Sequence, residues 1–144
     1  MTRPLPPWPA DGTTLHLRVP ASAAGSAAAC DAAERHLAAA GLTPRAAYRV
    51  QLVLEELVMN VALHAAAAEA AIAVARVPDG VLLGVEDDGP PFDPTQAAPA
   101  AAPSLQPAPA GGLGLVLVRK SALAWAYERA GGRHNRLTVL VAAA

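Results

Sequence analysis

Three polar side chains interrupt the apolar stretch Leu52–Ala68 at regular intervals: Glu56, Asn60 and His64. Because residues four apart lie on one face of an α-helix, this spacing predicts a polar row along an otherwise apolar helix. Buried polar groups need partners, so the row meets the rest of the fold or a ligand, unless it simply faces solvent. An Asn amide oxygen suits Mg²⁺, and a Glu carboxylate one turn away can accept a proton from an attacking hydroxyl or water.

A second candidate is the segment Val85–Asp93, VEDDGPPFD, at the end of a predicted strand. The carboxylate of Asp87 can accept a hydrogen bond from an exocyclic amine such as that of adenine. Gly89 has no Cβ and therefore lets a flat ring approach the backbone. The same residues are also typical of an ordinary acidic turn, so this segment alone does not decide between a binding site and a turn.

A third candidate is the glycine-rich segment Gly111–Leu115, GGLGL, which opens an apolar helical pattern over Leu115–Leu123. Backbone N–H groups at the start of a helix lie at the positive end of its dipole and bind phosphate. The glycines are equally compatible with the hinge of a lid. The segment contains neither the GxxxxGK[ST] pattern of a P-loop nor the third glycine of the dinucleotide fingerprint.

The elements that must position these residues follow from periodicity and from turn residues. Ser22 is the predicted cap of a helix that runs to about Ala40, and Thr43-Pro44 is the predicted start of the long helix with the polar row. Strand patterns gathered mostly in the second half, in two hairpins, predict an α+β fold with an antiparallel-rich sheet and helices on one face. The predicted strands are Thr13–Val19, Glu69–Val77, Val81–Asp87, Ala124–Arg129 and Arg136–Val141, with turns at 78–80 and at Gly131–Asn135.

Two proline-rich stretches lie outside this pattern. Residues 1–12 are predicted to be a flexible N-terminal arm, and residues 13–144 a single domain. Residues 90–110 contain seven of the fourteen prolines, which excludes a continuous helix or a central strand. A loop of this length is usually a functional lid or disordered.

The bulk composition narrows the class of protein. The formal net charge is −1, so nothing indicates a general attraction to nucleic acid or to acidic membranes. The single cysteine, Cys30, excludes an intramolecular disulfide and a cysteine-built metal site. The N-terminus lacks the apolar core of a secretory signal, and the apolar run Ala65–Val77 is too short to span a bilayer. A cytoplasmic domain is therefore expected.

Taken together, the three candidates resemble the GHKL (histidine-kinase-like) ATPase superfamily. The E-x3-N-x3-H row, the D-x-G turn and the G-x-G helix start correspond in order and spacing to its N, G1 and G2 boxes. The pieces EELVMNVALHA, DDGPPFDP, GGLGLVLVRK and YERAGGRHNRLTV are typical of the anti-sigma-factor serine/threonine kinase branch, and the likeness covers about Thr13 to Val141. The resemblance implies a two-layer α/β sandwich, the Bergerat ATP-binding fold, with a mixed, mostly antiparallel sheet and residues 90–110 as the ATP lid.

The resemblance also implies a role for each motif residue. Glu56 would be the general base and Asn60 would hold Mg²⁺ against the phosphates of ATP. His64 belongs to the same motif and is counted with the nucleotide-binding residues, although no role for it can be derived. The remaining predicted contacts are Asp87 with the adenine amine and Gly89 beside it, Gly112, Leu113, Gly114 and Leu115 on the phosphates, and Thr138 in support of adenine.

The activity that the resemblance implies is transfer of the γ-phosphoryl group of ATP to a Ser or Thr hydroxyl of a STAS-type anti-sigma antagonist. The protein would also sequester a sigma factor and form a homodimer, with no direct contact to nucleic acid or membrane. The first predicted helix lacks the arginine near its start with which relatives often engage the partner. The alternative is therefore a non-catalytic nucleotide-binding module that regulates its partner only by contact.

Overall fold

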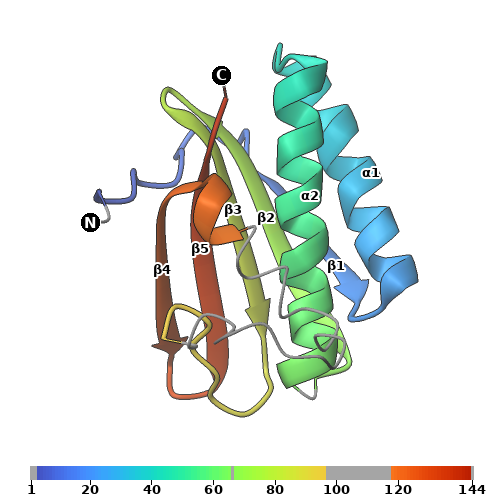
Figure 1. Ribbon diagram of the computed structural model, residues 1–144, viewed down its shortest axis with the longest axis vertical. Coiled ribbons are helices and arrows are strands. Elements are labelled where there is room, and N and C mark those ends of the chain that lie inside the picture. Colours follow the sequence, from blue (N-terminus) through green and yellow to red (C-terminus); the bar gives the residue numbers. More distant parts are fainter. Residues whose placement is uncertain (1–2, 66, 97–117, 144) are drawn as a thin grey trace, which may run out of the picture.

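The structure, a computed structural model, describes residues 3–65, 67–96 and 118–143. In these residues five strands form one sheet, and two long helices pack on one face of it (Figure 1). The strands pair in the order β1-β2-β3-β5-β4, and every neighbouring pair is antiparallel. This confirms the predicted α+β sandwich. The strands are β1 (Leu15–Pro20), β2 (Glu69–Val77), β3 (Gly80–Asp87), β4 (Ala122–Ala130) and β5 (His134–Ala142).

The last hairpin differs from its prediction at both ends. β4 begins at Ala122, two residues before the predicted start, and its register with β5 shifts between Ala122 and Ala124. The turn is shorter than predicted, because Gly131 and Gly132 reverse the chain with φ of 59° and 69°. β5 therefore begins early enough to include Asn135, a residue that the sequence pattern places in the turn.

The two helices begin where their capping residues predict. Helix α1 (Ala23–Ala39) is capped by Ser22, whose hydroxyl accepts a hydrogen bond from the Gly25 backbone N–H at 3.1 Å. Helix α2 (Pro44–Asn60) is capped in the same way by Thr43. Among the described residues, no helix is both long enough and apolar enough to cross a bilayer.

The second helix ends earlier than predicted. Instead of running to Ala68, α2 ends at Asn60 and passes into a π-helical turn, η1 (Val61–Ala65). A π-helical turn is wider than an α-helical one. His64 is therefore rotated away from the position that a continued α-helix would give it.

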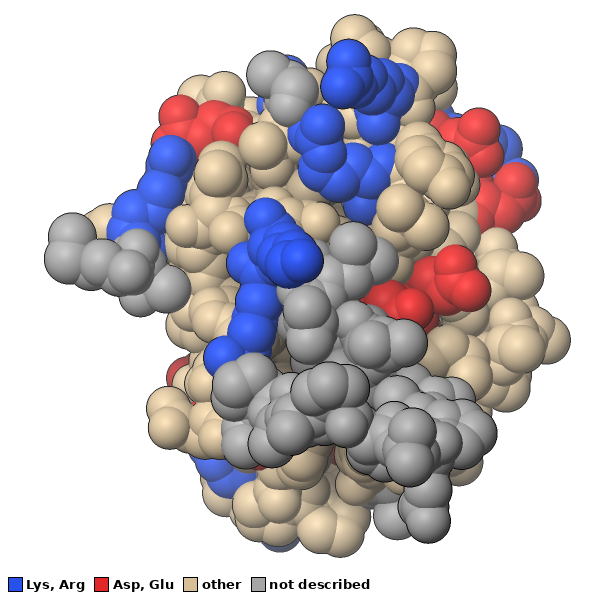
Figure 2. Space-filling view, in the orientation of Figure 1, with Lys and Arg blue, Asp and Glu red and all other residues tan. Residues whose placement is uncertain are grey.

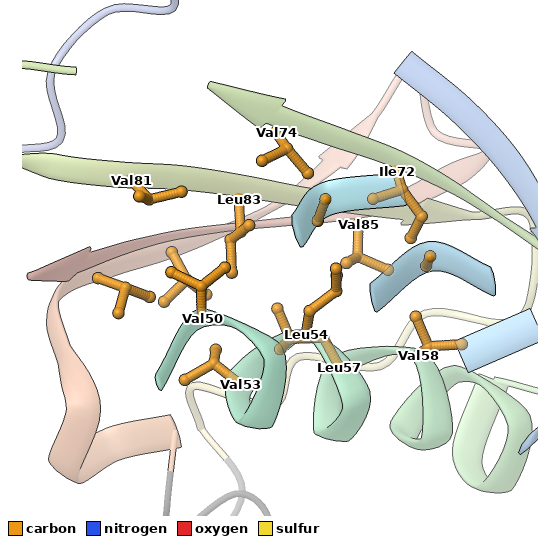
Figure 3. Close-up of a cluster of buried hydrophobic side chains, with 14 of the residues drawn as sticks. Val50, Val53, Leu54, Leu57, Val58, Ile72, Val74, Val81, Leu83 and Val85 are labelled. Atoms are coloured by element: carbon orange, nitrogen blue, oxygen red, sulfur yellow. The ribbon is translucent and has the colours of Figure 1, made fainter. Parts of the chain in front are cut away.

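The core lies between α2 and the sheet, and it is built from valine and leucine. Figure 3 shows the buried face of α2 interlocking with side chains of β2 and β3. Because these side chains are almost fully buried, each contributes about 1.5–3 kcal/mol of transfer free energy. The labelled core residues are Val50, Val53, Leu54, Leu57, Val58, Ile72, Val74, Val81, Leu83 and Val85.

The described part of the N-terminal arm crosses the opposite face of the sheet. Leu5 and Trp8 pack on a second buried cluster that includes Leu82 and Leu140. Trp8 lies against Gly84, where a Cβ would come within 3.0 Å of its ring. The sequence predicts a flexible arm over residues 1–12, and its pattern does not show this contact, because the arm finds its partners only once the sheet has formed.

The charges on the helix side are unevenly distributed. In Figure 2, Lys and Arg side chains gather toward the end of the molecule at which α2 begins, and Asp and Glu side chains form separate, smaller groups. The net charge near zero therefore combines surface regions of opposite sign.

Candidate functional site

The floor of the candidate site is made by two cross-strand rows on the helix-facing side of the sheet. In the first row Asp87 of β3 lies opposite Asn135 of β5, and Asn135 lies opposite Arg129 of β4. Side chains directly opposite in neighbouring strands are close enough to interact. The second row, one step farther along the strands on the same face, consists of Val85, Leu137 and Tyr127.

The walls and the cover of the site come from α2 and from the segment after β3. Leu57, Asn60 and Val61 line one side, while Phe92 and Pro94 lie over the cavity. The cavity measures only about 20 Å³, which is room for about one water molecule. The cavity is therefore too small for a purine ring as it stands.

Asp87 is held in one orientation. Its carboxylate is 8% exposed, and Oδ1 accepts hydrogen bonds from the Gly89 backbone N–H at 2.8 Å and from Asn135 Nδ2 at 3.0 Å. Among the described residues, no donor reaches Oδ2. The second oxygen is therefore the one that can accept a hydrogen bond from a ligand.

Glu56 and Asn60 lie one turn apart on the last turns of α2, as the spacing predicts. Asn60 is 7% exposed, and its Oδ1 is buried without a hydrogen-bond partner among the described residues. Burial raises the pKa of the half-buried Glu56 carboxyl, and the neighbouring Glu55 carboxylate raises the pKa further. Glu55 therefore acts on the Glu56 carboxyl through its negative charge.

The orphaned oxygen of Asn60 makes the site suitable for Mg²⁺. Magnesium prefers oxygen ligands and usually takes only one or two from the protein, with phosphates and waters supplying the rest. In the described part of the chain, no group of three or more His, Cys, Asp or Glu residues could hold a metal by itself. An Mg²⁺ ion that binds the Asn60 amide oxygen and takes its remaining ligands from a nucleotide and from water fits this environment.

His64 is not among the residues that line the cavity. It is exposed on η1, and its ring stacks on Phe92 with 5.3 Å between the ring centroids and 21° between the planes. In this structure His64 thus contacts the cover of the cavity, and its predicted nucleotide contact stays a prediction. The π-helical turn is the physical reason, because it redirects the chain just before this residue.

Thr138 lies on the wrong face of the sheet for its predicted role. It borders a groove on the outer face together with Trp8, Gly84 and Arg136. Side chains alternate between the faces of a strand, so Leu137, and not Thr138, points into the cavity. The position of Thr138 therefore gives no support to its predicted contact with adenine, which stays a prediction.

The predicted phosphate contacts Gly112, Leu113, Gly114 and Leu115 lie outside the described residues, as do residues 97–110 of the predicted lid. Of the helix predicted over Leu115–Leu123, residues 118–121 are described and are helical. The last two residues of the prediction belong instead to β4, which begins at Ala122. Val118 within it is fully buried against the main core.

Asn135 is the site residue that the sequence analysis missed. It is 5% exposed and hydrogen-bonds to the D-x-G turn, to the cover segment and to β4. The sequence feature that points to Asn135 is its position two residues before Leu137. If the strand begins early enough, this spacing places both side chains on the same face of the sheet. Its neighbours, Gly131 to His134, indicate a turn instead.

The fold and the site define an antiparallel α+β domain with a partly apolar pocket floor, a fixed carboxylate and an amide oxygen without a partner among the described residues. The family model of the histidine kinase-like ATPase domain matches residues 19–141. The chain therefore belongs to the histidine kinase-like ATPase domain family, which confirms the predicted superfamily and implies binding of ATP.

Two further comparisons complete this placement. The crystal structure of the SiaB–SiaC complex from Pseudomonas aeruginosa contains a similar chain, with a TM-score of 0.56 and 19% sequence identity. The similarity covers 88% of this chain and 88% of that chain. At this level of identity it supports the fold alone. No curated protein sequence matches this chain.

Proposed function

We propose that this protein is an ATP- and Mg²⁺-dependent serine/threonine protein kinase of the anti-sigma type. The observation that carries the proposal is the pair on α2: the unpartnered, buried Oδ1 of Asn60 with the Glu56 carboxylate one turn away. The first group suits a magnesium–phosphate complex, and the second suits a proton acceptor.

The adenine of ATP would occupy the cavity under Phe92. Val85 and Leu137 provide an apolar floor for the ring, and Oδ2 of Asp87 would accept a hydrogen bond from its amino group. Because the cavity is small in this structure, binding requires displacement of the cover. Loss of the His64–Phe92 stack would accompany that movement.

Glu56 would accept the proton of the attacking Ser or Thr hydroxyl. Its raised pKa brings the carboxylate closer to the operating pH, where a general base works best. When bound, Mg²⁺ would neutralise charge on the phosphates, and Asn60 would hold it through its amide oxygen. Phosphoryl transfer needs mainly positioning and charge neutralisation, and these residues supply both.

The proposed acceptor is a STAS-type antagonist, and the proposed second partner is a sigma factor that the protein sequesters, with the protein acting as a cytoplasmic homodimer. The resemblance of the sequence to anti-sigma kinases supports this assignment. The similar chain in a structure of two associated proteins, SiaB and SiaC, is consistent with action through a partner. The Lys and Arg side chains that gather toward the end of the molecule at which α2 begins (Figure 2) offer a surface for an acidic partner.

Phosphoryl transfer by a Glu56→Gln variant tests the proposal, with Glu55→Gln as the matched control on the same helix. We expect both variants to bind ATP like the wild type. Only Glu56→Gln should lose transfer of ³²P from ATP to a purified STAS protein encoded beside this chain. Equal transfer by both variants would remove Glu56 from the mechanism.

A non-catalytic module is the second candidate, because the cavity is small and the first helix carries no basic residue before Arg35. It predicts that the wild-type protein binds ATP and a partner but transfers no phosphate. The same assay therefore decides between the two functions.

A further inference from the structure

The amide group of Asn135 stabilises the D-x-G turn from the neighbouring strand. Its Nδ2 donates hydrogen bonds to Asp87 Oδ1 at 3.0 Å and to the carbonyl of Pro90 at 2.8 Å. The carbonyl of Gly89 lies at 3.5 Å from the same nitrogen. One side chain on β5 therefore fixes both the carboxylate and the backbone that follows it.

The amide oxygen of Asn135 anchors the other side of the site. It accepts hydrogen bonds from the Phe92 backbone N–H at 3.1 Å, from the Tyr127 hydroxyl at 2.5 Å and from the Arg129 guanidinium at 3.2 Å. These three groups come from the cover segment and from β4. A buried side chain with this many partners is part of a network in which each bond constrains the others.

The partners permit only one orientation of this amide. If nitrogen and oxygen were exchanged, the oxygen would face the acceptors of Asp87 and Pro90, and the nitrogen would face three donors. Nδ2 therefore always points at Asp87. As a result, Oδ1 of Asp87 is occupied and Oδ2 is the oxygen left for a ligand.

We infer that Asn135 is a positioning residue that sets the preference of this site for a 6-amino purine, an inference that rests on the proposed ATP site. By holding Oδ1 of Asp87, it presents Oδ2 as an acceptor toward the base. An adenine amine satisfies that acceptor. The O6 atom of hypoxanthine is itself an acceptor and does not, so the site rejects ITP relative to ATP.

The test compares the dissociation constants of ATP and ITP for the full chain by calorimetry. Asn135→Leu and Asn135→Ala both remove the donor to Asp87 and the acceptor for Tyr127, at two side-chain sizes. Val139→Ala is the stability control, because this fully buried residue lies on the same strand and does not line the cavity. If Asn135→Leu does not fold, the smaller Asn135→Ala still gives the comparison.

We expect both Asn135 variants to reduce the preference for ATP over ITP by about tenfold, the lower end of what one hydrogen bond to a charged group provides. Val139→Ala should lower Tm and leave the preference unchanged, since a purely structural defect weakens both nucleotides alike. An unchanged preference in both Asn135 variants would overturn this inference alone. A wild-type protein that binds no ATP would overturn the proposed function as well.

Discussion

Replacing Asp87 by Asn is the most direct perturbation of the proposed adenine contact. Two donors, the Gly89 N–H and Asn135 Nδ2, already occupy one side of the carboxylate, at 2.8 and 3.0 Å. The new amide must keep its oxygen on that side, because an amide nitrogen there would face two donors. Its NH₂ group is therefore forced into the position of Oδ2, where it opposes the amino group of adenine.

The size of the effect follows from this arrangement. Loss of a hydrogen bond to a charged acceptor costs about 1.5–3 kcal/mol, and the two opposed donors left unpaired cost about 1–3 kcal/mol more. ATP affinity should therefore fall by roughly 10²- to 10⁴-fold. ITP should be affected in the opposite direction, because its O6 can accept from the new NH₂ group. Asp87→Asn is thus expected to invert the preference between the two nucleotides.

Calorimetric titration of wild type and Asp87→Asn with ATP and with ITP measures both effects. Far-ultraviolet circular dichroism establishes that the variant is folded. Equal weakening of both nucleotides in a folded variant would refute the geometric argument, because it would mean that the amide orientation is not fixed. Unchanged ATP affinity would remove Asp87 from the binding site.

Three further outcomes are expected. Thr138→Val should leave ATP affinity unchanged in the same titration, because the side chain is on the outer face; a marked loss would contradict the strand parity. Gly84→Val should displace Trp8 and lower the free energy of unfolding by about 1–3 kcal/mol through overpacking, without affecting ATP binding. Because the pKa of the Glu56 carboxyl is raised in the folded state, the contribution of this group to the free energy of unfolding should fall as pH rises from its ordinary value of 4.5 through its folded-state value. Glu56→Gln should therefore match wild type in urea titrations at pH 3 and exceed it at pH 7 by about 0.5 kcal/mol or less; an excess at pH 3 would contradict the sign.

The sequence predicts those parts of the fold that depend on local chemistry. Ser22 and Thr43 cap their helices as expected, and alternating residues place the strands of the first hairpin, β2 and β3, to within one residue. The spacing of Glu56 and Asn60 survives in the structure because both fall within one regular helix. These features need only near neighbours, so a linear pattern contains them.

The parts that fail depend on contacts between distant segments. Trp8 packs against Gly84, and these two residues lie far apart in the chain. The π-helical turn that redirects His64 leaves no mark in an alanine- and leucine-rich stretch. Thr138 is a different case: alternation from the buried Val139 places it on the outer face, whereas its predicted adenine role rests on the family resemblance alone.

The pairing of β3 with β5 has a consequence for how the site assembles during folding. Asp87 and Asn135 are register partners, although 48 positions separate them in the chain. The adenine-facing half of the site therefore cannot exist until this long-range pairing has closed the intervening chain. Loop closure becomes only about 0.6 kcal/mol more costly with each doubling of length. Residues added to the connection between the two strands should therefore cost the carboxylate–amide pair little stability, provided that they leave Phe92, Tyr127 and Arg129 in place.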